Sequence, residues 1–259
     1  MDFFEKYKSI FDSETTFSSA SIKDHLAKLE EIDSYLPPSQ SFFIFINTAS
    51  SSYEFVSKNF EYSLGYNREE MLKYGAKFWI SCLHPEDCEN WLKSSQDMMD
   101  FTLSKVNLAD RKKLVYSYNF RVKTAQGSYV QIVASLTPTH FDEKGKPILG
   151  LAHYTIVETE GQSSSCGVKI LDENNRYKTL FYKNYFHESL FSKLSQRQVE
   201  IVKLLADGKK SKEIAKEIFL SNHTVDGHRR NILKKLGFRS TDELIQHLKS
   251  HELNEKHSI

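Results

Sequence analysis

Cysteine is scarce in this sequence of 259 residues, which contains three. Cys82, Cys88 and Cys166 cannot all pair and show no Cys-x-x-Cys spacing, so neither a disulfide scaffold nor a zinc knuckle is expected. No apolar run is long enough to cross a bilayer, and the start MDFFEKYK lacks the basic and then apolar layout of a secretion signal. We therefore expect a soluble, cytoplasmic protein that has no membrane partner.

The sequence motifs of common enzyme classes are missing as well. There is no Gly-x-Ser-x-Gly, no His-Glu-x-x-His and no kinase loop. The stretch 161–167 is not a phosphate loop, because Val168 and Lys169 stand where Lys-Ser/Thr is required. The cluster HPEDC at 84–88 is too compressed to converge on one metal ion from the start of a helix. We predict no catalytic residue, no metal site and no enzymatic activity.

The composition fits a folded protein with an uneven distribution of charge. Apolar residues make up 39% and charged residues 27% of the chain, and the length fits one large domain or two ordinary ones. Residues 189–250 hold 13 Lys and Arg against 7 Asp and Glu, whereas residues 1–188 hold 21 against 25. The basic segment indicates a polyanionic partner, although a charged helix face is often only solvated.

The first part of the chain combines helices with strands. Residues 1–40 form a helical segment, in which apolar residues recur every three or four positions until Pro37 and Pro38 end the pattern. There follow two strand-like segments (SFFIFINT and YEFVSKNF), short helices, one longer helix that opens at His84-Pro85, and three strands joined by turns. This order predicts an α+β fold with an antiparallel sheet and helices packed on one face.

Residues 41–158 resemble a PAS domain. Three features carry the resemblance: the segment YEFVSKNFEYSLGYNREEML, the HPED sequence that opens a helix, and the hairpin pattern F-R-V-K-T-x-x-G-S-Y-V. The resemblance implies a sensor domain whose cavity holds haem, flavin or a small-molecule effector. Other members of the family dimerise or bind a protein instead.

The sequence does not identify a cofactor for this domain. The cysteine-containing stretch G-R-N-C-R-F-L-Q, which such domains use in flavin photochemistry, is missing. His84 is the obvious candidate for a haem ligand, yet its place before a proline favours capping or packing. His140 and His153 lie on expected strands, where a histidine is more often structural. The cofactor is unknown, with haem, flavin and a small metabolite left open.

Residues 159–189 join the two halves of the chain. Their first part, TEGQSSSC, is small and polar, as in linkers, and the segment VKIL-DENN-RYKTLFYK predicts a hairpin with a four-residue turn. In this interpretation, the linker and its hairpin carry any conformational change from the first domain to the second.

Residues 190–250 predict four short helices. Serines precede three of these helices and mark N-caps, and glycines end two of them: Ser195, Ser211, Ser221, Gly208 and Gly237. A tight turn between the second and third helices fits a helix-turn-helix arrangement.

This block resembles the LuxR-type helix-turn-helix domain. The match runs through L-S-x-R at 194–197, L-L-A-x-G at 204–208, S-K-E-I-A at 211–215, S-x-x-T-V at 221–225 and H-x-x-N-I-x-x-K-L-G at 228–237. The resemblance covers the whole of such a domain. It implies that the partner is double-stranded DNA, read by the third helix.

The third helix carries the predicted reading surface. Its apolar residues Val225 and Ile232 fall on one side, and Arg230 and Lys234 fall on the other, where such groups can bond base edges. By the resemblance, positions 226, 227 and 230 read bases, while 212 and 224 hold phosphates. We predict base contacts from Asp226, Gly227, Arg230 and Lys234. Phosphate contacts are predicted from Lys212, Ser221, Thr224, Arg229 and Lys235.

Two positions depart from the family pattern, and one helix is expected to pair. Asp226 stands where Lys is common, and a carboxylate can accept from cytosine N4 but cannot bind guanine, so the preferred DNA sequence should differ. Gln198 replaces the usual Glu, which puts a helix-pinning contact in question.

The family usually pairs through its fourth helix, here around Leu244, Ile245 and Leu248, so we expect a homodimer.

Taken together, the two resemblances predict a cytoplasmic transcription regulator. A small-molecule effector or partner would bind the PAS-like domain and shift a population between two domain arrangements, which changes operator binding. An alternative is a PAS-based signalling adaptor with incidental DNA affinity, and a third interpretation is a PAS-fold enzyme. A phosphorylated response regulator is disfavoured, because residues 1–158 lack the alternating strand–helix pattern of a receiver domain.

Overall fold

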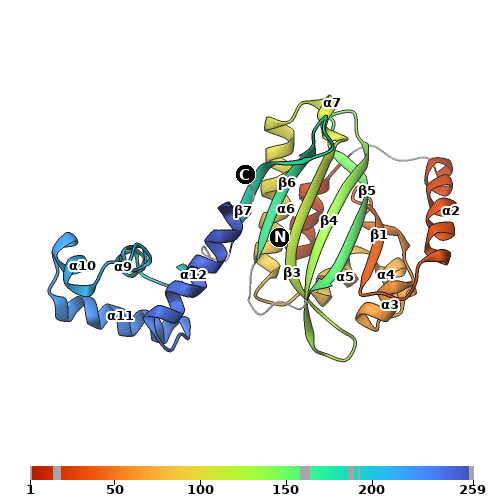
Figure 1. Cartoon of the computed structure of the whole chain (residues 1–259). Helices are drawn as coiled ribbons and strands as arrows, with labels where there is room; N and C mark the ends of the chain where they lie inside the picture. The colour runs from red at the N-terminus through yellow and green to blue at the C-terminus, as the bar shows by residue number, and fades with distance from the viewer. Residues whose placement is uncertain (1, 14–18, 158–163, 186–189, 192, 257–259) are drawn as a thin grey trace. The chain divides into compact units, whose positions relative to one another are not determined.

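In the computed structural model, the chain folds into two compact units (Figure 1). The residues that the structure describes are 2–13, 19–157, 164–185, 190–191 and 193–256. The first unit spans Met1–Lys183 and the second spans Asn184–Ile259. None of the helices in the described ranges combines the length and the hydropathy that a membrane span requires.

The first unit begins with helices and ends with strands. In chain order its elements are α1 (Phe3–Phe11), α2 (Ser19–Tyr35), β1 (Ser41–Asn47), β2 (Ser52–Val56), α3 (Asn59–Leu64), α4 (Arg68–Tyr74), α5 (Ala76–Cys82), α6 (Cys88–Lys105), α7 (Leu108–Arg111), β3 (Leu114–Lys123), β4 (Tyr129–Phe141), β5 (Pro147–Val157), β6 (Ser165–Leu171) and β7 (Tyr177–Asn184). Two strands, short helices, one long helix and three strands follow one another as the sequence predicts.

The strands form one seven-stranded sheet in the order β2-β1-β5-β4-β3-β6-β7. β1 pairs antiparallel with β2 and β5, β4 with β3 and β5, and β3 with β6. The predicted α+β fold with an antiparallel sheet is confirmed. The hairpin β6–β7 was expected inside a linker at 159–189, and it extends this sheet instead. Residues 158–163 and 186–189 of that segment lie outside the described residues.

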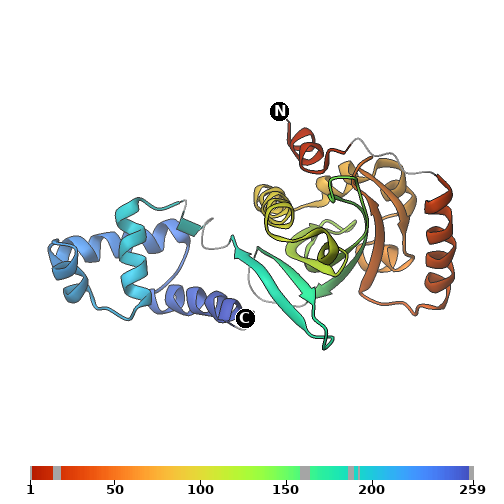
Figure 2. The same cartoon turned by 90° about the horizontal axis from the view of Figure 1, so that it is seen from above.

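Alternating residues of β1 face two different layers. Phe42 and Ile44 are fully buried in the main core, which also takes side chains from α1 and from α3 to α5. Phe45 points to the other face and packs with Leu29 of α2. Figure 2 shows α2 on the side of the sheet opposite to α1 and α6. The structure therefore adds one helix to the face expected to be bare, because β1 is apolar on both sides.

The helix expected to open at His84-Pro85 begins later, at Cys88. The Asp87 amide donates to the His84 carbonyl at 2.9 Å, which closes a turn before the helix. The Asp87 carboxylate accepts from the guanidinium of Arg121 at 2.6 and 3.0 Å and from its backbone amide at 2.8 Å. Since this carboxylate binds β3, it makes no capping bond to α6, and Pro85 lies in the turn.

The second unit contains α9 (Gln196–Ala206), α10 (Ser211–Glu217), α11 (Asn222–Leu236) and α12 (Thr241–Lys256). The apolar sides of these helices meet in one core, whose buried residues are Ile201, Val202, Leu205, Ile214, Ala215, Ile218, Val225, Ile232, Leu244 and Leu248. A short turn joins α10 to α11, which is the helix-turn-helix arrangement that the spacing predicts.

Two of the three predicted serine N-caps are present in the structure. Ser195 and Ser221 cap α9 and α11, because each hydroxyl accepts the backbone N–H three residues on. Ser211 is the first residue of α10 and not its cap, and its hydroxyl accepts a hydrogen bond from Arg229. Gly237 ends α11 in the left-handed conformation with φ of 77°, as predicted.

Candidate functional site

The helical repeat gives α11 one buried and one exposed side. Val225 and Ile232 are 0% and 1% exposed and face the core, as predicted. Arg230 and Lys234 are exposed, one turn apart, and Asp226 lies one turn before Arg230 with 41% of its side chain exposed. The structure thus brings three of the predicted base-contact residues into one stripe along α11.

Gly227, the fourth predicted base contact, leaves a gap beside this stripe. A methyl group built on its Cα would meet no heavy atom within 4 Å. Packing inside the unit therefore does not require a glycine here, although glycine costs about 1 kcal/mol of helix stability relative to alanine. The missing side chain allows another molecule to approach the backbone of α11 closely.

The start of α11 gathers hydroxyl groups. Ser221 Oγ accepts from the Thr224 amide at 3.0 Å and lies 2.7 Å from Thr224 Oγ1. Both residues are exposed, as is Lys212 in the first turn of α10. Unpaired N–H groups and hydroxyls at a helix start can bind phosphate oxygens. These three predicted phosphate contacts therefore lie on the surface, with chemistry suited to an anion.

Arg229 and Lys235, the other two predicted phosphate contacts, have partners inside the unit. Arg229 donates to Ser211 Oγ at 2.5 Å and to Thr241 Oγ1 at 2.9 Å, which ties α11 to α10 and to the start of α12. Lys235 donates to Gln198 Oε1 at 2.9 Å. Both side chains thus stabilise the arrangement of the helices, and a role toward DNA stays a prediction for them.

Gln198 makes the helix-pinning contact that its replacement of Glu put in question. It is 5% exposed, and its Oε1 accepts from the Ser195 amide at 3.1 Å as well as from Lys235. An amide oxygen accepts hydrogen bonds as a carboxylate does, although it brings no charge. The tie between α9 and α11 is therefore kept by a hydrogen bond instead of an ion pair.

The fourth helix carries the residues of the predicted pairing surface. Leu244 and Leu248 are 1% and 3% exposed and belong to the core of their own unit, while Ile245 is partly buried against that core. The expected pairing around these three residues stays a prediction. Two of them are already used to hold α12 on α9 and α11.

Phe219 is a surface residue that the sequence reasoning missed. It lies in the turn between α10 and α11, is 93% exposed, and has a left-handed backbone with φ of 54°. An apolar residue directly after the buried Ile218 suggests burial from the sequence alone. Phe219 is exposed instead, because α10 has ended before it and the turn directs its side chain to solvent.

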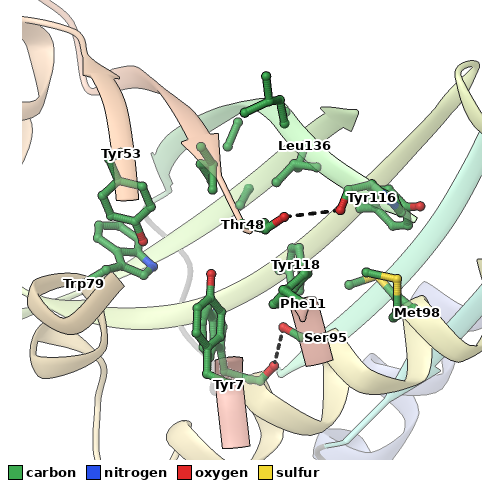
Figure 3. A pocket seen from close by; sticks show the side chains of 18 of the residues that line it. Tyr7, Phe11, Thr48, Tyr53, Trp79, Ser95, Met98, Tyr116, Tyr118 and Leu136 are labelled. Atoms are coloured by element: carbon green, nitrogen blue, oxygen red, sulfur yellow. Dashed lines mark hydrogen bonds between the residues drawn. The ribbon is translucent and has the colours of Figure 1, made fainter. Parts of the chain in front are cut away.

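In the first unit, a partly open cavity of about 70 Å³ lies between the sheet and helices α1, α5 and α6 (Figure 3). This is several times the ~10–15 Å³ that a cavity needs in order to hold one water molecule. Aromatic rings dominate the lining: Tyr7, Phe11, Tyr53, Trp79, Trp91, Tyr116, Tyr118, Phe120 and Tyr154. The volume is about half of the ~150 Å³ of an engineered cavity that binds benzene, so a small aromatic molecule enters only if the walls of the cavity move apart.

The cavity is electrically neutral. Among the described residues that line it, none carries a carboxylate, amine, guanidinium or imidazole group. Burial raises the pKa of Tyr116 to about 12, and it raises the pKa of Tyr7, Tyr118 and Tyr154 further above the ordinary value. The tyrosine hydroxyls therefore stay protonated near neutral pH and can both donate and accept hydrogen bonds.

The histidines considered as haem ligands do not line this cavity. His84 Nδ1 accepts the Glu86 amide at 3.2 Å within the turn before α6, and its ring packs on Tyr129 with centroids 4.4 Å apart, so it packs and does not cap the helix. His140 lies with its ring 5.3 Å from that of His25, and His153 is exposed on β5. No pattern in the sequence marks the actual lining, because the residues come from α1, α5, α6 and the strands β1 to β5.

Two family models match the chain. Residues 192–248 match the model described as "Bacterial regulatory proteins, luxR family", and residues 53–152 match the model described as "PAS fold". The first match covers α9 to α11 and the start of α12, which includes the exposed stripe of α11. The second runs from β2 into β5 and includes most of the strands around the cavity.

Similar proteins match over shorter parts or at low identity. The Fimbriae Z protein of Salmonella typhimurium is 50% identical over 60 residues, which are 23% of this chain and 29% of that protein. The oxygen regulatory protein NreC of Staphylococcus aureus is 44% identical over 57 residues, 22% of this chain and 26% of that protein. The chain thus spans less than a third of the length of either relative.

The solved structures that match include VqmA bound to DPO, with 15% identity, a TM-score of 0.36, and coverage of 85% of this chain and 89% of that one. The phage VqmA–DPO complex has 13% identity, a TM-score of 0.37, and coverage of 90% and 91%. On the two family matches, and as the sequence motifs predict, this chain carries a LuxR-type helix-turn-helix domain of the bacterial regulatory proteins at residues 192–248 and a PAS fold at residues 53–152.

Proposed function

We propose that this chain is a DNA-binding transcription regulator whose PAS fold senses a small molecule or a partner and thereby modulates DNA binding. One observation carries the proposal: within the match to the luxR family, α11 presents Arg230 and Lys234 to solvent on the side opposite to the buried Val225. Such a regulator acts in the cytoplasm, where it meets DNA, and needs no catalytic residue.

In this proposal, α11 lies in the major groove. Arg230 and Lys234 donate to guanine O6 and N7, Asp226 accepts from cytosine N4, and Gly227 allows the close approach. Phosphates are bound at the start of α11 and beside α10, by Lys212, Ser221 and Thr224. These phosphate contacts fix the orientation of the helix, and the base contacts select the sequence.

We propose further that the chain binds DNA as a homodimer. One helix-turn-helix domain contacts few base pairs, and two domains bind half-sites about one helical turn apart, on the order of 10 base pairs. Because Leu244 and Leu248 lie in the core of their own unit, pairing through α12 would use other residues of this helix, among them the partly buried Ile245. The first unit is the other candidate for the dimer contact.

Helix α6 connects the cavity with the end of the first unit. Its Met98 lines the cavity, while the Phe101 ring stacks on Phe181 of β7 with centroids 5.1 Å apart. Asp97 pairs with Lys183 at 2.9 Å, and Lys183 is the last residue of the first unit. A molecule that displaces α6 from within the cavity would therefore shift β7 and the chain that leads into the LuxR-type domain.

DNA binding by the full-length protein tests the proposal. Fluorescence anisotropy with duplex DNA at about 50 and 200 mM salt should show a steep loss of affinity, because phosphate contacts release counterions. Arg230→Ala should weaken binding to the preferred site roughly 5- to 150-fold, as expected for the loss of a bidentate base contact. The matched control is Lys203→Ala, which removes one positive charge from an exposed position on α9. The proposal would be contradicted if both substitutions weakened DNA binding equally, or if the affinity for DNA did not depend on the salt concentration.

A further inference from the structure

We propose that the cavity of the first unit binds a compact, uncharged molecule whose polar group is held by the hydroxyls of Tyr7, Tyr53 and Tyr154. The inference rests on the proposed sensing role of the PAS fold. It specifies the chemical class of the molecule that is sensed and assigns α1 as the wall that closes over it.

The three tyrosines are buried but have hydroxyls without partners. They are 4%, 5% and 6% exposed, and come from α1, β2 and β5. Within the described part of the chain, none of these hydroxyls makes a hydrogen bond. Side-chain atoms that are both unpaired and sealed from any probe belong there to Asn59 and Gln131. The tyrosine oxygens are not among these sealed atoms, and all three tyrosines line the cavity.

A neighbouring tyrosine shows the usual arrangement. Tyr116 also lines the cavity, and its hydroxyl lies 3.0 Å from Thr102 Oγ1, a partner within the protein. Buried hydroxyls usually find such a partner, because burying one without a hydrogen bond costs free energy. Three hydroxyls around one space therefore have hydrogen bonds to be completed from within the cavity, and we assign these to the bound molecule.

The rest of the lining restricts the charge of that molecule. The lining holds no ionisable side chain other than the tyrosines, whose burial keeps them protonated. An ion would lose its hydration and meet no opposite charge, which is costly in an apolar interior. Trp79 and Phe120 offer aromatic surface to an apolar body. The preferred molecule therefore combines an uncharged apolar body with at least one hydrogen-bonding group.

The wall formed by α1 lies outside the residues that match the PAS fold. Tyr7 and Phe11 reach the cavity from this helix (Figure 3). The Tyr7 ring stacks on Trp91 of α6 at 5.4 Å between centroids, and the Asp12 carbonyl after the helix accepts from Lys146 at 2.6 Å. Because α1 supplies one of the three hydroxyls, it senses the occupant directly.

Tryptophan fluorescence of the full-length protein can report occupancy without a label. The chain has two tryptophans, and both line the cavity. Three probes of similar size separate the chemistry: phenol is neutral and hydrogen-bonding, toluene is neutral without a hydrogen-bonding group, and benzoate is an anion. With excitation at wavelengths that phenol does not absorb, we expect saturable changes with phenol, weaker binding of toluene, and no saturable change with benzoate.

Removal of single hydroxyls is the decisive comparison. Tyr7→Phe and Tyr154→Phe each keep the ring and should weaken phenol roughly 2- to 12-fold, as the loss of one hydrogen bond implies, while toluene binds as before or more tightly. Tyr62→Phe, on a side chain that is 65% exposed, is the matched control and should change neither affinity. Benzoate binding as tightly as phenol, or phenol affinity that both cavity variants leave unchanged, would overturn the inference.

The same samples distinguish this inference from the proposed function. Duplex DNA binding is measured separately on each variant. If phenol follows the expected pattern but Arg230→Ala leaves DNA binding intact, the cavity assignment stands and the regulator proposal fails. If DNA binding behaves as proposed and the three probes do not differ, the regulator proposal stands and the cavity assignment fails.

Discussion

Arg229 and Arg230 are neighbours in α11, and the structure gives them different surroundings. Arg229 donates to hydroxyls of α10 and α12, so its guanidinium is part of the internal structure of the unit. Arg230 is exposed in the stripe with Lys234. Arg229 therefore contributes to the stability of the unit, whereas Arg230 is free for the proposed base contact. The effects of the two side chains on stability can be measured separately.

We expect Arg229→Ala to lower the free energy of unfolding by about 1–3 kcal/mol, because the substitution leaves Ser211 Oγ and Thr241 Oγ1 without their donor. Arg230→Ala should change it by no more than about 0.5 kcal/mol, as is usual for surface substitutions. Urea unfolding followed by circular dichroism measures both. A comparable loss in the two variants would contradict the different structural roles of Arg229 and Arg230.

The buried tyrosines also predict how stability depends on pH. Burial raises the pKa of Tyr116 to about 12, whereas tyrosines of an unfolded chain titrate near 10. The fold favours the protonated hydroxyl, so its contribution to stability is complete below about pH 10 and is lost as the pH rises toward about 12. Urea midpoints measured from about pH 8 to 11.5 should therefore fall at the alkaline end.

Tyr154→Phe removes one of these groups and should make that alkaline fall less steep, because one proton fewer is released on unfolding. The exposed Tyr62 serves again as the control, since Tyr62→Phe should leave the slope unchanged. Stability that stays constant up to about pH 11.5 in the unsubstituted protein would contradict the raised pKa of these hydroxyls.

At the scale of helices and strands, local patterns were sufficient for the types and order of the elements. They failed at boundaries where a side chain binds a distant partner. Asp87 is bound by Arg121, 34 residues away, and α6 therefore starts after Pro85. The Ser211 hydroxyl is bound by Arg229, 18 residues away, so it does not cap α10. No local pattern indicates either partner.

One part of the candidate site could likewise be predicted from local sequence patterns, and another part could not. The exposed stripe of α11 could be predicted, because one helix carries it and the repeat fixes its sides. The cavity could not be predicted, because it is assembled from residues as far apart as Tyr7 and Tyr154. Burial of Leu244 and Leu248 was missed for a related reason, since a core residue and a pairing residue of a helix have the same apolar spacing.

The contact between α6 and β7 carries a prediction at this scale. Phe181→Ala removes the ring that stacks on Phe101. Saturating phenol should change the DNA affinity of the unsubstituted full-length protein, and this change should largely vanish in Phe181→Ala while phenol still binds. Tyr177→Ala, at an exposed position of the same strand, is the control. An undiminished effect of phenol in Phe181→Ala would exclude this contact as the route of coupling.

At the scale of the whole molecule, the chain unites a neutral aromatic cavity in a PAS fold with a LuxR-type domain whose third helix exposes basic residues. The units have separate cores, and the chain passes from one to the other directly after the β6–β7 hairpin. This organisation is suited to a regulator in which occupancy of one unit changes the state of the other, because each unit can keep its fold while the connection moves.

The central claim, that α11 reads DNA sequence, is tested most directly by selection of duplexes from a random pool with the full-length protein. We expect enrichment of one site with two symmetry-related half-sites on the order of 10 base pairs apart, and loss of that enrichment in Arg230→Ala. A pool that stays random, or an Arg230→Ala protein that selects the same site, would contradict the claim.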